Sequence, residues 1–196
     1  MSRLLEYFPG CAGADEAGRG PLAGPVVAAA VMIPEGVRFE GLNDSKQLDR
    51  AKRDQLEVLI RDKCDFAICF IDAAEIDRIN ILQASLLAMK QALSMLSAPP
   101  SHVYIDGNRL PSGVTGTAVV KGDSKIAEIA AASILAKNER DRFMRLMAAE
   151  YPGYGFESHY GYPTPPHLAA LQTLGPCAIH RKSYAPVQEL LQPRLL

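Results

Sequence analysis

The sequence predicts an α/β domain built on a mixed β-sheet, with a small helical part attached at its C-terminal end. Two apolar runs around a glycine-rich turn, within residues 11–33, are typical of an opening pair of strands. Strand and helix patterns then alternate up to residue 150, as they do in α/β domains. Residues 151–196 differ, because Gly, Pro, Tyr and His are concentrated at their start. We therefore expect one domain over residues 1–150 and a C-terminal segment over 151–196 that packs on it.

The first half of the chain contains three strand patterns and one helix pattern. Ala, Val and Ile dominate the second strand, and Gly and Pro occupy the connection before it. Asp49 can cap a helix whose apolar residues Leu56, Leu59 and Ile60 fall on one face. The predicted elements are strands over residues 11–15 and 26–33, a loop over 34–44, a helix over 50–63 and a strand over 66–71.

The second half contains longer helices. Asp72 and Glu75 have the spacing of a capping box, and a Pro-Pro pair ends the helix that they open. Another helix pattern begins at Ser124, with Ala and Ile in its first part and charged residues after Lys137. The predicted elements are a single helix over residues 73–96, strands over 102–106 and 117–120, a helix over 124–150 and two short helices after 166.

The composition is that of an ordinary globular protein, with 48% hydrophobic and 22% charged residues among 196. Its net charge of −1 excludes a globally basic nucleic-acid binder, so a polyanion must be held by a local patch or through metal ions. No apolar run reaches the roughly 20 residues of a membrane span, and the first residues lack the apolar stretch of a signal peptide. We expect a soluble cytoplasmic protein whose four cysteines, without zinc-site spacing, remain reduced.

Four acidic residues stand in similar settings, next to an apolar segment and close to a glycine. They are Asp15 and Glu16 before Gly18-Arg19-Gly20, Asp106 before Gly107, and Asp123 after Gly122. Acids at the ends of strands can converge on one point, where they repel one another unless cations lie between them. Carboxylate oxygens suit hard ions such as Mg²⁺ and Mn²⁺, and two ions about 4 Å apart can promote hydrolysis of a phosphodiester. The pattern therefore predicts a two-metal site for phosphoryl transfer.

Each acid also has a purely structural interpretation. Successive side chains of a regular strand point to opposite faces, so Asp15 and Glu16 share a site only if the strand ends there, as Gly18 favours. Asp106 could be a turn residue, and Asp123 could cap the helix that follows it. Taken alone, Asp106 and Asp123 leave both interpretations open. The four acids together favour the metal site.

An ordered series of motifs resembles the type 2 ribonuclease H family, and within it ribonuclease HII. The matching strings are Asp15-Glu16-Ala17-Gly18-Arg19-Gly20-Pro21-Leu22-Ala23-Gly24, Leu42-Asn43-Asp44-Ser45-Lys46, Ile105-Asp106-Gly107-Asn108, Lys121-Gly122-Asp123-Ser124, Ala131-Ala132-Ser133-Ile134-Leu135-Ala136-Lys137, Gly161-Tyr162-Pro163-Thr164 and His180-Arg181-Lys182-Ser183. The resemblance implies a ribonuclease H-like fold, with the catalytic domain over residues 1–150. Asp15, Glu16, Asp106 and Asp123 would then be the catalytic acids, binding Mn²⁺ or Mg²⁺.

The implied reaction is cleavage of the RNA strand in RNA–DNA hybrids. It includes incision 5′ of single ribonucleotides in duplex DNA, which leaves a 3′-hydroxyl and a 5′-phosphate and serves DNA repair and replication. The implied partners are these nucleic acids, without a membrane, and we expect a monomer. The sister class, ribonuclease HIII, lacks the Gly-Arg-Gly motif that this chain carries.

The same resemblance implies how a ribonucleotide is recognised. The backbone of Gly18, Arg19 and Gly20, together with Tyr162 of the C-terminal segment, would read the 2′-hydroxyl, the group that distinguishes RNA from DNA. Glycine suits this role because a side chain would keep the backbone away from the sugar.

Further substrate contacts would come from the strings around residues 43–46 and 160. Asn43 and Lys46 are candidate substrate-binding residues, with Lys46 placed to contact a phosphate. Tyr160 stands where the family commonly has a lysine, so a phosphate contact is either missing or supplied by another residue.

Other charged and aromatic residues have simpler interpretations. Lys137, Arg140, Arg142 and Arg145 alternate with acids, which is typical of a solvated helix face. The aromatic residues of 151–162 favour a local aromatic core, with Tyr162 set apart by its motif. Arg181 and Lys182 leave contact with the DNA strand an open question.

Two other functions compete with the nuclease interpretation. A hybrid-binding module without catalysis would lack one of the acids, and all four are present. Another nuclease of ribonuclease H-like fold would not need the Gly-Arg-Gly loop or the context of Tyr162. The sequence therefore favours a metal-dependent endoribonuclease.

Overall fold

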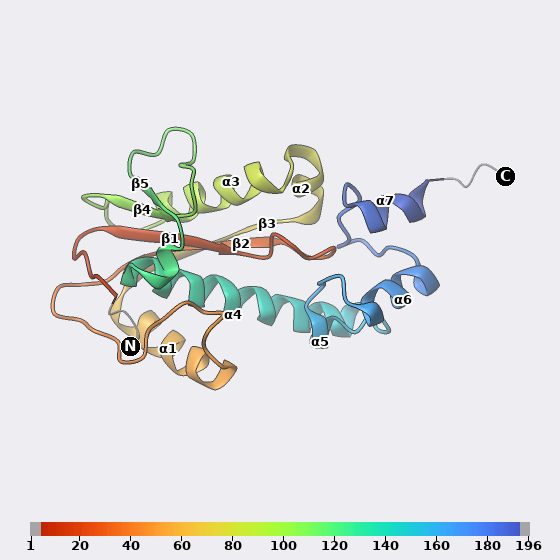
Figure 1. Ribbon diagram of the computed structural model, residues 1–196, viewed down its shortest axis with the longest axis horizontal. Coiled ribbons are helices and arrows are strands. Elements are labelled where there is room, and N and C mark those ends of the chain that lie inside the picture. The colour runs from red at the N-terminus through yellow and green to blue at the C-terminus, as the bar shows by residue number, and fades with distance from the viewer. Residues whose placement is uncertain (1–4, 193–196) are drawn as a thin grey trace.

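The computed structural model describes residues 5–192, which form a five-stranded sheet with helices on both faces (Figure 1). The strands are β1 (Ala12–Ala17), β2 (Val26–Met32), β3 (Asp65–Ile71), β4 (Val103–Asp106) and β5 (Thr117–Val119). The helices are α1 (Arg50–Lys63), α2 (Ala73–Ile79), α3 (Ile81–Ser94), α4 (Ala127–Glu150), α5 (Phe156–His159), α6 (Pro165–Leu174) and α7 (Ala185–Leu191), with a 3₁₀ helix at Gly122–Ser124.

The sheet is mixed and has the order β3-β2-β1-β4-β5, which places β1 at its centre. β2 pairs antiparallel with both β1 and β3. On the other side of β1, β4 pairs parallel with β1, and β5 pairs parallel with β4. In Figure 1, α2 and α3 cover one face of the sheet, and α4 with α1 covers the other. This layered arrangement confirms the predicted α/β class and puts Asp15 and Glu16 on the central strand.

β2 illustrates how the sequence builds these layers. Val26, Ala28 and Ala30 belong to the core that includes α3, whereas Ala29 and Val31 belong to the core that includes α4. Successive side chains of a strand point to opposite faces, and both faces are covered here. A strand buried on both sides must be apolar throughout, which is the pattern that the sequence shows.

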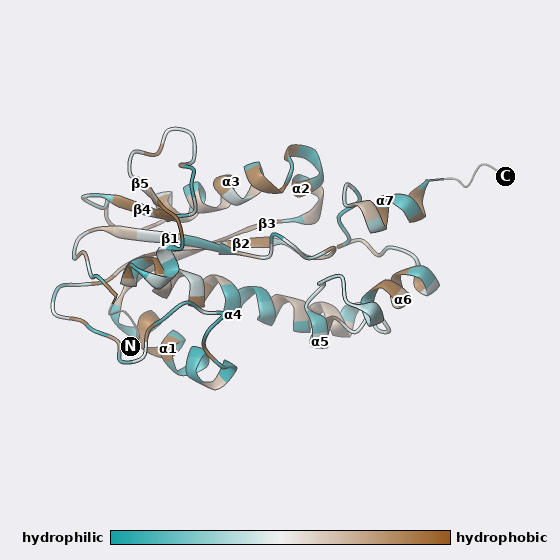
Figure 2. Ribbon diagram, viewed as in Figure 1, coloured by the Kyte–Doolittle hydropathy of each residue, from teal (hydrophilic) through white to brown (hydrophobic). Residues whose placement is uncertain are grey.

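The N-terminal part of α4 is almost wholly buried, because small side chains let it approach the sheet closely. A Cβ at Gly13 of β1 would lie 2.3 Å from the backbone of Glu128, so only glycine fits there. In Figure 2, β1 changes from pale to the hydrophilic colour toward its C-terminal end. The polar end of a strand packed this tightly indicates a functional edge of the sheet.

The predicted helix over residues 73–96 is wrong in one respect, since the structure divides it at Asn80. Asn80 has a φ of 66°, a left-handed conformation that Asn adopts more readily than most residues. Its side chain accepts a hydrogen bond from the Gln83 amide at 3.1 Å and so caps α3. The predicted caps at Asp49 and Asp72 are confirmed, because each side chain accepts the expected backbone N–H.

The helix expected from residue 124 begins at Ala127, after the separate 3₁₀ helix. The two short helices predicted near the C-terminal end are α6 and α7, and a further short helix, α5, precedes them. Among the described residues, the structure contains no helix with the length and apolarity needed to span a membrane.

The C-terminal segment has a small core of aromatic and histidine rings. Tyr154 and Phe156 stack at a centroid distance of 5.2 Å, as predicted for the aromatic residues of this stretch. Cys177 N–H donates to His180 Nδ1 at 3.0 Å, and the Nε2 atoms of His180 and His167 lie 3.1 Å apart. His167 Nδ1 lies 2.8 Å from the carbonyl oxygen of Tyr162.

These contacts determine where the histidine protons lie. Nδ1 of His180 accepts from Cys177, so its proton is on Nε2 and is donated to His167. The Nδ1–H of His167 is then free to donate to the Tyr162 carbonyl. Both rings are neutral in this arrangement. Burial, and then the proximity of His167, lower the pKa of His180 to about 4, which agrees with the neutral form.

Candidate active site

The four predicted acids lie at adjoining ends of the central elements. β1 and β4 pair in parallel up to Ala14 opposite Ile105, so Asp15 and Asp106 occupy the next position on each strand. Asp106 is the last residue of β4, and Asp123 is in the 3₁₀ helix that leads toward α4. The sheet topology therefore brings three segments that are remote in sequence to one edge.

The expectation that β1 ends at Asp15 and Glu16 is wrong. β1 continues to Ala17, which pairs with Val27 of β2. What ends at this point is β4, so the edge of β1 that faces it is unpaired beyond Ala14. This open edge gives side chains from both faces of β1 access to the same space. Asp15 also turns toward its own backbone, where its Oδ1 accepts the Glu16 N–H at 2.7 Å.

Burial and mutual repulsion both act on the pKa values of these acids. Burial, followed by the charges of Glu16 and Asp106, raises the pKa of Asp15 well above its ordinary value. Burial also raises the pKa of Glu16, against the nearby Arg19, and Asp106 adds to the rise. Burial and the charge of Asp106 raise the pKa of Asp123 to about 6. A set of carboxylates that interact in this way is a strong site for a cation.

The structure does not support the capping interpretation of Asp123. Neither the 3₁₀ helix nor α4 has a side-chain cap, and Asp123 precedes the first residue of α4 by four positions. Asp106 is also more than a turn residue, because its Oδ1 accepts the Gly122 N–H at 2.7 Å. This bond connects the end of β4 to the residue that precedes Asp123. It holds two of the four acids in a fixed relation.

A fifth acid, Asp44, also lies near Asp123, although no sequence pattern placed it among the metal-site acids. Asp44 contributes to the raised pKa of Asp123. Lys46, two residues further on, brings its Nζ within 3.9 Å of Asp123 Oδ2. Partial burial lowers the pKa of Lys46, but Asp15, Asp44 and other carboxylates raise it, and the net result lies above the ordinary value. The predicted role of Lys46 near the acids therefore has a geometric basis.

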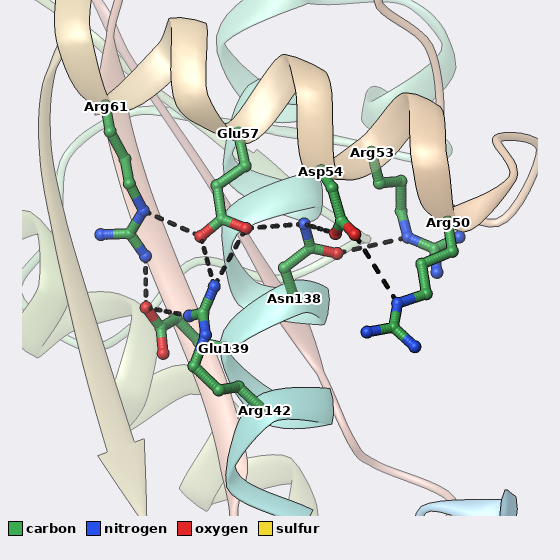
Figure 3. A network of polar contacts seen from close by, with 8 residues as sticks. All are labelled: Arg50, Arg53, Asp54, Glu57, Arg61, Asn138, Glu139 and Arg142. Atoms are coloured by element: carbon green, nitrogen blue, oxygen red, sulfur yellow. Dashed lines mark hydrogen bonds and ion pairs between the residues drawn. The ribbon is translucent and has the colours of Figure 1, made fainter. Parts of the chain in front are cut away.

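The loop that carries Lys46 is held by a polar network between α1 and α4 (Figure 3). Arg53 of α1 donates to the carbonyl oxygens of Ser45 and Leu48, at 3.2 and 2.7 Å. Its Nε also donates to Asn138 Oδ1 of α4 at 3.3 Å. Through Arg53, the network thus connects α4 to the residues on either side of Lys46.

The centre of the network is Glu57, a buried acid. Burial alone would raise its pKa, but hydrogen bonds from Asn138, Arg61 and Arg142 lower it below the ordinary value. In Figure 3, Arg61 and Arg142 converge on this carboxylate and on Glu139. Arg142 is exposed, as predicted for a solvated face, and it also belongs to an interhelical network.

The side chains present suit a hard divalent ion by their chemistry. In residues 5–192, no three or more His, Cys, Asp or Glu side chains lie together in a way that could by itself hold a metal ion. Magnesium-type sites usually take only one or two carboxylates from the protein, together with waters and substrate phosphates. A group of buried and half-buried carboxylates that repel one another offers only oxygen donors, which suit such an ion, and no soft ligand competes within it.

The Gly18-Arg19-Gly20 loop follows β1 directly. Gly18 has a φ of +100°, and a Cβ there would lie 2.1 Å from Arg140 Nε, so this position requires glycine. Arg19 places its Nη1 3.4 Å from Glu16 Oε1. A Cβ at Gly20 would lie 3.5 Å from the ring of Tyr162. The structure therefore brings the loop and Tyr162 together, as the two strings of the sequence predicted separately.

Two arginines beneath this loop have different positions from those predicted. Arg140 of α4, assigned to a solvated face, is only 1% exposed and donates to backbone carbonyls. Arg181, for which DNA contact was left open, is fully buried and cannot reach a DNA strand. Sequence patterns missed both because their acceptors are backbone oxygens, which leave no trace in the identity of neighbouring residues.

The remaining predicted residues occupy less direct positions. Asn43 stabilises its own turn, accepting the Asp44 N–H at 2.9 Å and donating to Gln47 at 3.3 Å. At Tyr160, the residue that replaces the usual lysine, the ammonium of Lys137 lies 5.1 Å from the ring centroid. Lys137 thus supplies a cation beside this position, although it also pairs with Asp141 at 2.7 Å.

Comparison with known proteins identifies the family. A family model described as Ribonuclease HII matches residues 12–187. This chain belongs to the ribonuclease HII family. Ribonucleases HII from Parvibaculum lavamentivorans and Maricaulis maris are 53% and 52% identical to it over 185 residues. These matches cover 93% of this chain in both cases, and 69% and 85% of the two relatives.

A solved ribonuclease HII-type structure supports the fold. The ribonuclease H2 of Pyrococcus horikoshii matches with a TM-score of 0.76 and 29% identity, over 92% of this chain and 96% of its own. The expected ribonuclease H-like fold is therefore confirmed. As a ribonuclease HII, the protein is a metal-dependent endoribonuclease that cleaves the RNA strand of RNA–DNA hybrids.

Proposed function

We propose that this ribonuclease HII incises duplex DNA 5′ of a single embedded ribonucleotide, using two Mn²⁺ or Mg²⁺ ions. The ions would be held by Asp15, Glu16, Asp106 and Asp123. The observation that carries the proposal is the contact between the Gly18-Arg19-Gly20 loop and Tyr162, directly beyond the two acids of β1. A loop that can meet one ribose at this edge does not require a run of ribonucleotides.

The chain's own residues would position the substrate. Exposed backbone at Arg19 and Gly20 would approach the 2′-hydroxyl, and the Tyr162 hydroxyl would form a second hydrogen bond to it. Tyr162 is 41% exposed, so its ring is available to a nucleotide sugar. Lys46, next to Asp123, would hold a phosphate and offset the negative charge of the cleft. The C-terminal segment therefore contributes to substrate binding through Tyr162.

The chemistry is hydrolysis of one phosphodiester. Water attacks the phosphorus, the bond from phosphorus to the upstream 3′-oxygen breaks, and the products are a 3′-hydroxyl and a 5′-phosphate on the ribonucleotide. When bound, the divalent ions would activate the water and stabilise the leaving oxygen. The acids' part is to hold those ions, and the loop and Tyr162 place the scissile phosphate beside them. Removal of ribonucleotides during DNA repair and replication is the process such an incision would serve.

One assay tests the reaction against its competitors. Wild-type protein is incubated with Mn²⁺ or Mg²⁺ and either an RNA–DNA hybrid, a DNA duplex with one ribonucleotide, or an all-DNA duplex. We expect cleavage of the first two only, and none after chelation of the metal. Cleavage of the all-DNA duplex would indicate a general nuclease. An intact single-ribonucleotide duplex beside a cleaved hybrid would overturn the proposal.

A variant tests the site itself. Asp106→Asn retains an oxygen that can accept the Gly122 N–H, so the turn should fold normally. Because it loses a charged metal ligand, turnover should fall by orders of magnitude. Asp62→Asn, an exposed acid on α1, is the matched control and should cleave at the wild-type rate. Normal turnover in Asp106→Asn would remove Asp106 from the mechanism.

A further inference from the structure

Two arginines are buried beneath the Gly18-Arg19-Gly20 loop without an acidic partner. Arg140 is 1% exposed and Arg181 is 0% exposed, and neither forms a salt bridge within residues 5–192. Burial, and then the charge of Arg181, lower the pKa of Arg140 to about 10, so Arg140 remains cationic at neutral pH. Burial also lowers the pKa of Arg181, but a guanidinium keeps its proton in proteins. Burying two like charges is costly unless their hydrogen-bonding groups are fully used. Their partners therefore reveal what the arrangement achieves.

The partners of Arg181 are carbonyl oxygens of the Gly18-Arg19-Gly20 loop and of Gly24, four residues beyond it. Its guanidinium donates to Gly18 O at 2.6 Å, to Arg19 O at 3.1 Å and to Gly24 O at 2.9 Å. Tyr184 adds a second donor to Arg19 O, through its hydroxyl at 2.8 Å, and accepts from Arg181 at 3.0 Å. One planar guanidinium thus holds the start of the loop next to Gly24.

Arg140 connects the same loop to the segment that carries Tyr162. It donates to Ala23 O, Pro25 O and Tyr160 O, each at 3.0 Å. Its guanidinium carbon also lies 5.9 Å from the centroid of the Tyr162 ring. A single side chain of α4 therefore links the residues that follow the Gly18-Arg19-Gly20 loop to the segment around Tyr162.

The direction of these carbonyls sets the direction of the neighbouring amides. In a trans peptide, the C=O of one residue and the N–H of the next point in opposite directions. Because the carbonyls of Gly18 and Arg19 point inward to Arg181, the N–H groups of Arg19 and Gly20 point away from it. Both residues are exposed, and no acceptor in the described part of the chain takes either N–H. Two donors are thereby presented outward.

We propose that Arg140 and Arg181 are positioning residues that set the ribonucleotide specificity of the site. They hold the Arg19 and Gly20 amides outward and keep Tyr162 beside them. The inference rests on the proposed role of this loop and Tyr162 in reading the 2′-hydroxyl. The arginines themselves touch neither substrate nor metal.

The test uses Arg140→Lys and Arg181→Lys, which keep the charge but lose the fork that reaches several carbonyls at once. The substrate is a duplex with one ribonucleotide, and an all-DNA duplex serves as competitor. We expect kcat/KM to fall at least about tenfold, the loss of roughly one hydrogen bond to the ribose. The Ki of the all-DNA competitor and the affinity for Mn²⁺ should stay within about twofold, a change worth less than a single hydrogen bond.

Controls separate this role from a general effect on folding. Arg145→Lys lies on the same helix, and the Arg145 side chain forms no hydrogen bond or salt bridge within residues 5–192, so its kcat/KM should match that of the wild type. If the arginine variants do not fold, Tyr184→Phe decides the question, because it removes only the hydroxyl bonds to Arg19 O and Arg181. We expect it to lower kcat/KM for the ribonucleotide duplex about threefold, in line with one weakened contact.

Three results would overturn the inference. The first is unchanged kcat/KM in folded arginine variants, or in Tyr184→Phe where these do not fold. The second is an equal rise in the Ki of the all-DNA competitor, which would indicate lost binding without lost specificity. The third is a wild-type protein that leaves the single-ribonucleotide duplex intact, which would refute the proposed function as well. Wild-type cleavage with unaffected variants would refute the arginine role alone.

Discussion

Replacing Asp123 by asparagine should make the metal-free protein more stable while weakening its stabilisation by metal. Burial and the charge of Asp106 raise the pKa of this carboxyl from 3.8 to about 6. At neutral pH the charge of the Asp123 carboxylate therefore destabilises the folded protein. The difference corresponds to about 3 kcal/mol, and screening by solvent reduces it to about 1–2 kcal/mol.

The sign follows from proton linkage. A carboxyl whose pKa is higher in the folded state keeps its proton longer there than in the unfolded chain. The stability that it contributes is complete below about pH 4 and is lost as the pH rises to about 6. Asparagine does not ionise, so the advantage of the variant grows as the pH rises from about 4 to 6 and is complete above about 6. For a protein of this size, 1–2 kcal/mol corresponds to a rise in Tm of about 2–8 °C.

The assay is urea or thermal unfolding in chelator and again with excess Mn²⁺. In chelator at neutral pH, Asp123→Asn should unfold at a higher urea concentration or temperature than wild type. The midpoints of the two proteins should become equal near pH 4. Added Mn²⁺ should stabilise the wild type clearly more than the variant, because binding to the native state raises its stability. Asp62→Asn, which changes an exposed acid, should behave as wild type in both conditions. A variant that is less stable than wild type in chelator would refute the reasoning.

Two further outcomes are expected. Tyr162→Phe should lower kcat/KM for a single-ribonucleotide duplex by about tenfold, the value of one hydrogen bond; equal rates would show that the ring alone is sufficient. In an NMR titration, the imidazole of His180 should remain neutral to about pH 4, so that it lowers stability as the pH falls from 6.5 toward 4. A midpoint near 6.5 would contradict the neutral chain of hydrogen bonds from Cys177 to Tyr162.

Local patterns account for the parts of the fold that sequence analysis predicted correctly. Asp49 and Asp72 begin their helices as expected, since a side chain and an amide three residues away meet whatever lies around them. The alternation of β2 and the apolar start of α4 follow from burial on one or two sides. The break at Asn80 is the exception, because Ile79 and Ile81 continue the apolar pattern across it.

The acids of the site show both what a sequence contains and what it omits. Asp15, Glu16, Asp106 and Asp123 could be proposed because each follows an apolar segment near a glycine. The reason why Asp15 and Glu16 reach the same space could not be inferred from the sequence, because it depends on where β4 ends beside β1. Strand pairing joins residues about ninety positions apart, and no local pattern records its limits.

The amino-acid order alone was sufficient to indicate the α/β class, the four acids and the two strings that meet at Gly20 and Tyr162. Only the folded chain showed that Arg140 and Arg181 are buried, and that Asp44 stands beside Asp123. Helix caps and strand alternation arise between near neighbours, so they are visible in the sequence. Arginines that bind backbone carbonyls do so without regard to the side chains at those positions, and therefore become evident only once the tertiary structure has formed.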